Sequence, residues 1–186
     1  MKAQTAGSRS RRRSQAGFTL IDLLFVIAII GLLSTLAIPG LMRARSAAQS
    51  GSALATLRII NSAQLSFAIT CGLGFYAPDF PALGKIPLGA NEAFLNPEMT
   101  GGVTFERSGY GFSMAATPVD GTPATCNGLE GGATGPGYAL VADPLDKAKP
   151  LRNFGTNADG VLYEHTETLG EVMPESGPPE VGQPVR

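Results

Sequence analysis

Residues 17–42 read GFTLIDLLFVIAIIGLLSTLAIPGLM, and this stretch decides the fold. Asp22 is its only charged residue, and almost every side chain from Leu23 to Ile38 is apolar. A helix needs about 20 mainly apolar residues to cross the hydrocarbon core of a bilayer. A buried core helix rarely stays apolar on every face over such a length. The stretch therefore predicts a membrane-spanning helix over residues 18–42.

Charge is distributed unevenly on the two sides of this stretch. Residues 1–17 hold five basic and no acidic side chains, whereas the rest of the chain holds nine Lys or Arg against 15 Asp or Glu. The positive-inside rule keeps the basic segment in the cytoplasm and places the rest of the chain across the membrane. The net charge of the whole chain is -1, which excludes a strongly basic nucleic-acid-binding protein, so we expect no nucleic-acid partner.

The front edge of the apolar stretch, Gly17-Phe18-Thr19-Leu20-Ile21-Asp22-Leu23-Leu24, follows directly on the basic segment. This arrangement resembles the prepilin signature of type IV pilins and of the pseudopilins of type II secretion. A secretory signal peptide fits less well, because its apolar part is only about 7–15 residues long. In the family, a membrane peptidase cuts after the glycine and methylates the new N-terminal residue. The resemblance implies that residues 1–17 are a cleaved leader, with the cut between Gly17 and Phe18 and methylation of Phe18.

The resemblance also implies roles for three residues inside the apolar helix. The family usually has Glu where this chain has Asp22, and that carboxylate is thought to pair with the N-terminal amine of a neighbouring subunit during filament assembly. A carboxylate also suits a helix start because the helix dipole favours negative charge there, so both interpretations stay open. Gly31 and Pro39 weaken the helix, and in related filaments this stretch loses helical order when subunits pack. A simple membrane-helix kink is the alternative.

Beyond the apolar stretch, apolar residues recur at steps of three and four and predict an amphipathic helix over residues 43–71, with Gln64 as the one break in the pattern. Together with residues 18–42 this would be one helix about 80 Å long. Gly72-Leu73-Gly74 is expected to end it. Residues 72–173 predict a globular head, and the Pro-rich residues 174–186 are expected to form a disordered tail.

Short segments of the head mix aromatic and β-branched residues between Gly- and Pro-rich turns, which favours strands. Asp159-Gly160 is typical of a turn between two antiparallel strands. We therefore predict an α+β fold in which the long N-terminal helix packs on a small antiparallel sheet, as in pilins. The segments that we expect as strands are 103–107, 110–115, 138–142, 151–155 and 161–165.

The residues offer little catalytic chemistry. Cys71 and Cys126 would lie in an oxidising compartment, so we expect a disulfide between them, with two free buried thiols as the alternative. Some pseudopilins bind calcium through loop oxygens, but the oxygen donors of this chain lack EF-hand spacing and are better explained as turn residues. These donors are Asp143, Asp146, Asn157 and Asp159. His165 is the single histidine. We predict no enzyme activity, no catalytic residue, no metal and no cofactor.

The resemblance implies a structural subunit that is anchored in the inner membrane, with its N-terminus in the cytoplasm, before it enters an extracellular or periplasmic filament. The implied partners are further copies in a helical filament, the prepilin peptidase that also methylates, the assembly platform in the inner membrane, and the membrane itself. A type IV pilus subunit is the main hypothesis, and a type II secretion pseudopilin is the alternative. A membrane-anchored exported binding module is a third hypothesis, from a different class of protein.

Overall fold

The computed structural model describes residues 17–147 and 151–185. The chain divides into two compact units, Met1–Met42 and Arg43–Arg186. The long helix α1 (Leu20–Thr70) contributes to both units. The second unit, which we call the head unit, also holds the short helix α2 (Phe80–Leu83), a 3-10 turn at Pro97–Met99 and a sheet. This combination confirms the predicted α+β fold.

Helix α1 agrees with the prediction from the apolar stretch and from the amphipathic pattern that follows it. Within residues 20–42 the large apolar side chains are all exposed, and by length and composition α1 can cross a membrane. Within the head unit one face of α1 is buried, including Leu57, Ile60 and Phe67. The helix ends where glycine is required: a Cβ atom on Gly72 would lie only 2.2 Å from the carbonyl oxygen of Phe75.

The sheet has six strands in the order β1-β2-β3-β4-β5-β6, and every neighbouring pair is antiparallel. The first five strands fall on the five predicted segments; β2 has the same bounds as its segment, and the ends of the others are shifted by at most two residues. Their bounds are β1 (Thr104–Arg107), β2 (Tyr110–Ala115), β3 (Ala139–Pro144), β4 (Asn153–Asn157) and β5 (Tyr163–His165). The Asp159-Gly160 step lies in the turn between β4 and β5, and Gly160 has the positive φ (74°) that such a turn requires.

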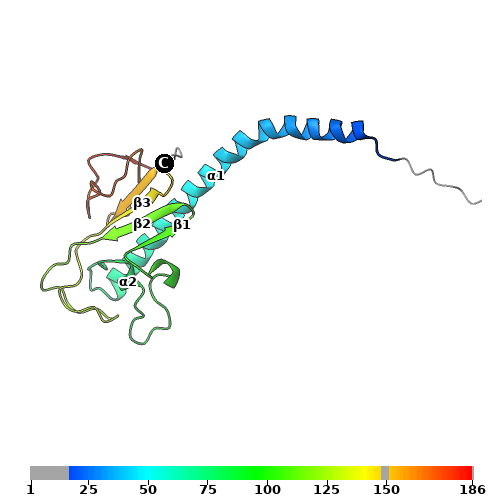
Figure 1. Cartoon of the computed structure of the whole chain (residues 1–186). Helices are drawn as coiled ribbons and strands as arrows, with labels where there is room; N and C mark the ends of the chain where they lie inside the picture. Colours follow the sequence, from blue (N-terminus) through cyan, green and yellow to red (C-terminus); the bar gives the residue numbers. More distant parts are fainter. Residues whose placement is uncertain (1–16, 148–150, 186) are drawn as a thin grey trace, which may run out of the picture. The chain divides into compact units, whose positions relative to one another are not determined.

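One face of the sheet packs on the head-unit part of α1 (Figure 1). Side chains alternate along each strand, so one set from the central strands meets the buried face of α1. The main core includes Phe112, Met114, Leu140 and Phe154. On the opposite face, Val141 and Tyr163 pack against Leu169 and Met173 of the segment after β5. The C-terminal segment therefore covers part of the second face of the sheet.

The prediction of a disordered tail from residue 174 differs from the structure, which describes the chain as far as Val185. Residues Gln183–Pro184 form the edge strand β6, paired with β5. Proline is tolerated there because an edge strand needs only one row of hydrogen bonds. The tail also closes a contact with the loop after β2, since the carboxylate of Glu175 accepts hydrogen bonds from the N–H and the hydroxyl of Thr117, both at 2.6 Å.

Two residues of the β4–β5 connection hold the same tail. The amide of Asn157 donates to the carbonyl oxygens of Pro174 (3.1 Å) and Gly177 (2.6 Å). The carboxylate of Asp159 accepts from the N–H of Gly177 at 2.7 Å. The composition of the tail alone suggested disorder, because these partners lie some 20 residues upstream and do not show in the local sequence.

Candidate functional site

The predicted processing site lies in the extended segment just before α1. Gly17 and Phe18 precede the helix, and the side chain of Phe18 is 90% exposed. A Cβ atom on Gly17 would meet no other atom within 4 Å, so nothing in the described residues requires glycine there. The packing of this chain therefore offers no structural reason for the glycine, and recognition by a processing enzyme remains the explanation that the motif suggests.

Asp22 forms a reciprocal cap with Thr19 at the start of α1. The N–H and the hydroxyl of Thr19 donate to Oδ2 of Asp22, at 3.0 and 2.5 Å, and the N–H of Asp22 donates to Oγ1 of Thr19 at 3.3 Å. This is the geometry of a capping box, with Asp in place of the usual Glu or Gln. Within the described residues Oδ1 of Asp22 takes no hydrogen bond, so Asp22 caps its own helix and still presents one carboxylate oxygen outward.

The weak stretch that was predicted between Gly31 and Pro39 lies inside α1, which is helical throughout. Pro39 has no N–H to donate to the carbonyl of Thr35, four residues earlier. Two hydroxyls bond back to the helix in this stretch, from Ser34 to the oxygen of Ile30 and from Thr35 to the oxygen of Leu32, both at 2.7 Å. Such back-bonding slightly destabilises and bends helices. The stretch is thus an intact but weakened part of α1, and its loss of helical order on packing stays a prediction.

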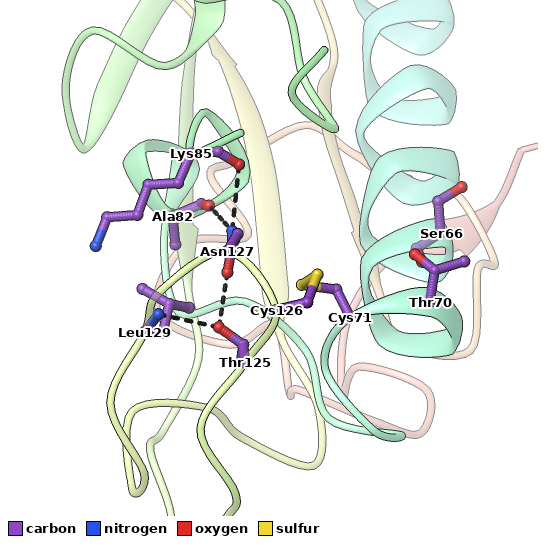
Figure 2. The surroundings of a disulfide bond; sticks show 9 residues. All are labelled: Ser66, Thr70, Cys71, Ala82, Lys85, Thr125, Cys126, Asn127 and Leu129. Carbon is purple, nitrogen blue, oxygen red and sulfur yellow. Dashed lines mark hydrogen bonds between the residues drawn. A yellow bond between two sulfur atoms is a disulfide. The ribbon is translucent and has the colours of Figure 1, made fainter. Parts of the chain in front are cut away.

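The disulfide between Cys71 and Cys126 is present and joins the end of α1 to the loop that connects β2 and β3 (Figure 2). Cys71 is buried, and its carbonyl oxygen also accepts from the N–H of Cys126 at 3.4 Å. A second tie lies further along the loop, where Gly135 and Tyr76 form a two-way backbone bridge. The bond therefore closes a loop of chain, with a sequence separation of 55, over one end of the core.

Asn127, next to the disulfide, is a structural residue that sequence reasoning missed. It is buried, and its amide donates to the carbonyl oxygens of Ala82 (2.8 Å) and Lys85 (3.4 Å), as Figure 2 shows. Its own oxygen accepts from the hydroxyl of Thr125 at 2.7 Å. Asn127-Gly128 looks like an ordinary turn in the sequence. Asn127 differs from the other turn residues in that its amide is buried, and the sequence does not show this burial.

Of the four oxygen donors expected in loops, the structure places Asp143 in β3 and Asn157 at the end of β4, and only Asp146 and Asp159 lie outside strands. Asn157 and Asp159 hold the tail, and Oδ2 of Asp143 accepts from the hydroxyl of Thr168 at 2.7 Å. Asp146 also has an interaction partner. His165 accepts a hydrogen bond from the N–H of Glu167. Across residues 17–147 and 151–185, no three His, Cys, Asp or Glu side chains come together in a group that could hold a metal ion.

Burial raises the pKa of two tyrosines, Tyr110 in β2 and Tyr138 just before β3, and the hydroxyl of Tyr110 also lies 3.2 Å from that of Ser50 on α1. The hydroxyl of Tyr138 donates to Oδ1 of Asn61 at 2.8 Å, and that of Tyr110 donates to the carbonyl of Arg152 at 3.0 Å. Loss of solvation raises the pKa of both side chains above their usual range, strongly so for Tyr138. Both therefore stay neutral donors at any physiological pH, in keeping with a structural role.

The similarity of this chain to known proteins lies in its N-terminal part. The family model described as the prokaryotic N-terminal methylation motif matches residues 12–38. Over 51 residues the chain is 41% identical to the type IV major pilin protein PilA of Myxococcus xanthus (strain DK1622), a region that covers 27% of this chain and 23% of that protein. No solved structure matches the chain. The N-terminal part of the chain, which combines this motif with an exposed apolar helix, therefore carries the type IV pilin signature of N-terminal methylation.

Proposed function

We propose that the chain is a structural subunit of a type IV pilus or of a similar surface filament. The observation that carries the proposal is the pairing of the methylation motif with an apolar helix surface that stays exposed among the residues that the structure describes. From Leu20 to Met42 the large apolar side chains are exposed, and Asp22 is the only charge. A bilayer covers such a surface in the single chain, and neighbouring copies cover it in a filament. The transfer between these two environments needs no new apolar exposure to water.

Processing would convert the chain into its working form. Removal of residues 1–17 takes away five basic side chains and leaves a net charge of -6 on the mature chain. Cleavage before the apolar helix, not after it, keeps the anchor in the mature protein. The new amine at Phe18 would lie four residues along the chain from Asp22, the charged group of the apolar helix. Melting of α1 between Gly31 and Pro39 would lengthen the subunit on assembly, in line with the weakened hydrogen bonding there.

The processing proposal predicts a mature chain that begins with N-methylated Phe18. The measurement is mass spectrometry of the N-terminal peptide from the protein purified from cells that make the filament. A Gly17→Ala variant is expected to stay largely unprocessed, because the peptidase recognises the glycine, while folding is untouched since a Cβ atom there meets nothing. A mature chain with an intact Met1 would contradict the proposed function.

Replacement of Asp22 is expected to block assembly without blocking cleavage. Asp22→Ala should reduce the yield of sheared surface filaments by about tenfold, because an unpaired amine would remain among apolar helices. Asp22→Asn is the sharper variant: its side-chain oxygen can still cap Thr19, but it carries no charge. If pairing with an amine is the role of Asp22, Asn should fail as Ala does, and Asp22→Glu should assemble. Normal filaments from Asp22→Asn would reduce Asp22 to a helix cap.

The pseudopilin of a type II secretion system is the alternative within this proposal. The similarity to a type IV major pilin of Myxococcus xanthus favours the pilus. Deletion of the chain separates the two: loss of surface filaments with intact protein export supports the pilus, and loss of export with no change in surface filaments supports the pseudopilin.

A further inference from the structure

Leu73 adopts a backbone conformation that usually belongs to glycine. Its φ is 52°, and it lies three residues beyond Thr70, the last residue of α1. The N–H of Gly74 donates to the carbonyl of Ala68, six residues earlier, at 2.9 Å, and Leu73 holds the left-handed backbone position in the turn that this bond closes after the helix. Gly72 and Gly74 lie on either side, yet the left-handed residue is a leucine with its side chain 69% exposed. The chain thus accepts strained backbone to place an aliphatic side chain on the surface.

Leu88 carries a second aliphatic side chain that is exposed to solvent, and it lies in a tight turn. The N–H of Ala90 donates to the carbonyl of Pro87 at 3.0 Å, and Gly89 has a φ of 83°, which is the pattern of a type II turn with Leu88 at its tip. The side chain of Leu88 is 93% exposed. The turn cannot move freely, because the N–H of Leu88 donates to the carbonyl of Cys126 at 3.2 Å.

The disulfide brings these two leucines to the same end of the head unit. Cys71 is two residues from Leu73, and Cys126 holds the turn of Leu88. Figure 2 shows the disulfide between the end of α1 and the segment of Lys85. Ile69 and Ile86, close in the chain to these leucines, are also exposed. We call Ile69, Leu73, Ile86 and Leu88 the disulfide-end patch.

The chain segments that meet at the disulfide contain no charged residue. The chain has no Asp, Glu, Lys or Arg in residues 59–78, 86–91 or 121–129, which are the segments that meet at the disulfide. The charged residues that border these segments in the chain are Arg58, Asp79, Lys85, Glu92, Asp120 and Glu130. Exposed apolar side chains on an uncharged surface mark protein contact sites, because the centre of an interface is depleted of charge.

We propose that the disulfide-end patch is a contact surface for a second copy of this chain in the filament. This inference rests on the proposed function and adds a specific contact between head units. A mature chain of charge -6 repels its copies, so copies that associate must meet through their uncharged surfaces. The patch is such a surface, and it continues onto the solvent face of α1, where Ile59 and Leu65 are also exposed. A lipid surface fits less well, because interfacial segments are rich in basic residues, whereas the residues that border the segments of the patch are four acidic and only two basic side chains.

The Leu73→Gly variant distinguishes a role in contact between subunits from a role in folding, because we expect it to raise the stability of the chain and to lower the filament yield. Glycine relaxes the left-handed position, so the Tm of the full chain in detergent should rise by roughly 2–4 °C. Filament yield should nevertheless fall, by about tenfold, because the contact is lost. Leu88→Ser should lower the yield to a similar degree with an unchanged Tm. Val181→Ser is the matched control, an exposed valine away from the patch, and should leave both unchanged. Normal filament yield from Leu73→Gly and Leu88→Ser would overturn the proposal.

The occupant of the patch can be identified by photo-cross-linking in intact filaments. A benzophenone side chain at position 88 should give a covalent dimer of this chain, whereas the same probe at position 181 should not. A cross-link from position 88 to another protein or to lipid, or no cross-link at all, would overturn the inference. If filaments form normally but these outcomes fail, only the contact is wrong. If the chain is not processed and makes no filaments, the proposed function fails with it.

Discussion

Replacement of both cysteines, Cys71→Ser with Cys126→Ser, should lower the free energy of unfolding of the head unit by about 4 kcal/mol. The bond joins residues with a sequence separation of 55, so its removal frees a long loop in the unfolded chain. The released segment includes the connection after α1, all of β1 and β2, and part of the loop that follows. Urea unfolding of the full chain in detergent, followed by circular dichroism, measures the loss.

Reduction of the unaltered chain is the matched comparison. A reductant should cause the same loss in the wild-type chain and no change in the double serine variant, because only the wild type has a bond to break. A loss below 1 kcal/mol would show that the other ties of the loop suffice without the disulfide. Those ties are the backbone bridge between Tyr76 and Gly135 and the amide bonds of Asn127.

The features that the sequence predicted well are those with local causes. The long helix follows from an apolar run and a period of 3.6 residues, and its end follows from a glycine that the backbone requires at position 72. Five strands follow from short β-rich segments between turns. The disulfide between Cys71 and Cys126 was predicted because both cysteines follow the apolar helix and would lie in an oxidising compartment.

The features that the sequence did not predict depend on contacts between distant residues. Asn127 reaches Ala82 across 45 positions, and Glu175 reaches Thr117 across 58. An amide or a carboxylate in a Gly-rich loop looks the same whether its partner is water or a buried carbonyl. The tail therefore seemed disordered by composition, although contacts of this kind hold it to the sheet.

Gln64 shows this limit clearly, because the sequence revealed that it breaks the apolar pattern of α1 but did not reveal why a polar residue is needed there. It interrupts the apolar face of α1, and the structure buries it completely, with 0% exposed. Its amide pairs with both backbone groups of Ala77: Nε2 donates to the carbonyl oxygen and Oε1 accepts from the N–H, each at 2.9 Å. The side chain thereby imitates a neighbouring strand and fixes the segment that leaves the helix end, six residues beyond the disulfide-bonded Cys71.

Gln64→Leu should therefore lower the free energy of unfolding by about 3 kcal/mol, although leucine fits the apolar pattern of α1 better. Ala77 is completely buried, so its N–H and its carbonyl would each be left without a partner, at roughly 1–3 kcal/mol apiece. Gln183→Leu, at an exposed glutamine of β6, is the matched control and should change the stability by less than about 0.5 kcal/mol. Urea unfolding of both variants in detergent measures the difference.

Gln64→Glu distinguishes loss of hydrogen bonds from loss of shape, because it keeps the size of the side chain and changes only its donors. Ionised, the carboxylate accepts from the N–H of Ala77 but cannot donate to the carbonyl. Protonated, it does both, so the stability deficit of Gln64→Glu should be large at neutral pH and should shrink as the pH falls. The deficit of Gln64→Leu should not follow the pH, since leucine offers no donor in either range. A deficit of equal size for both variants at every pH would show that packing, not the pairing with Ala77, requires glutamine at this position.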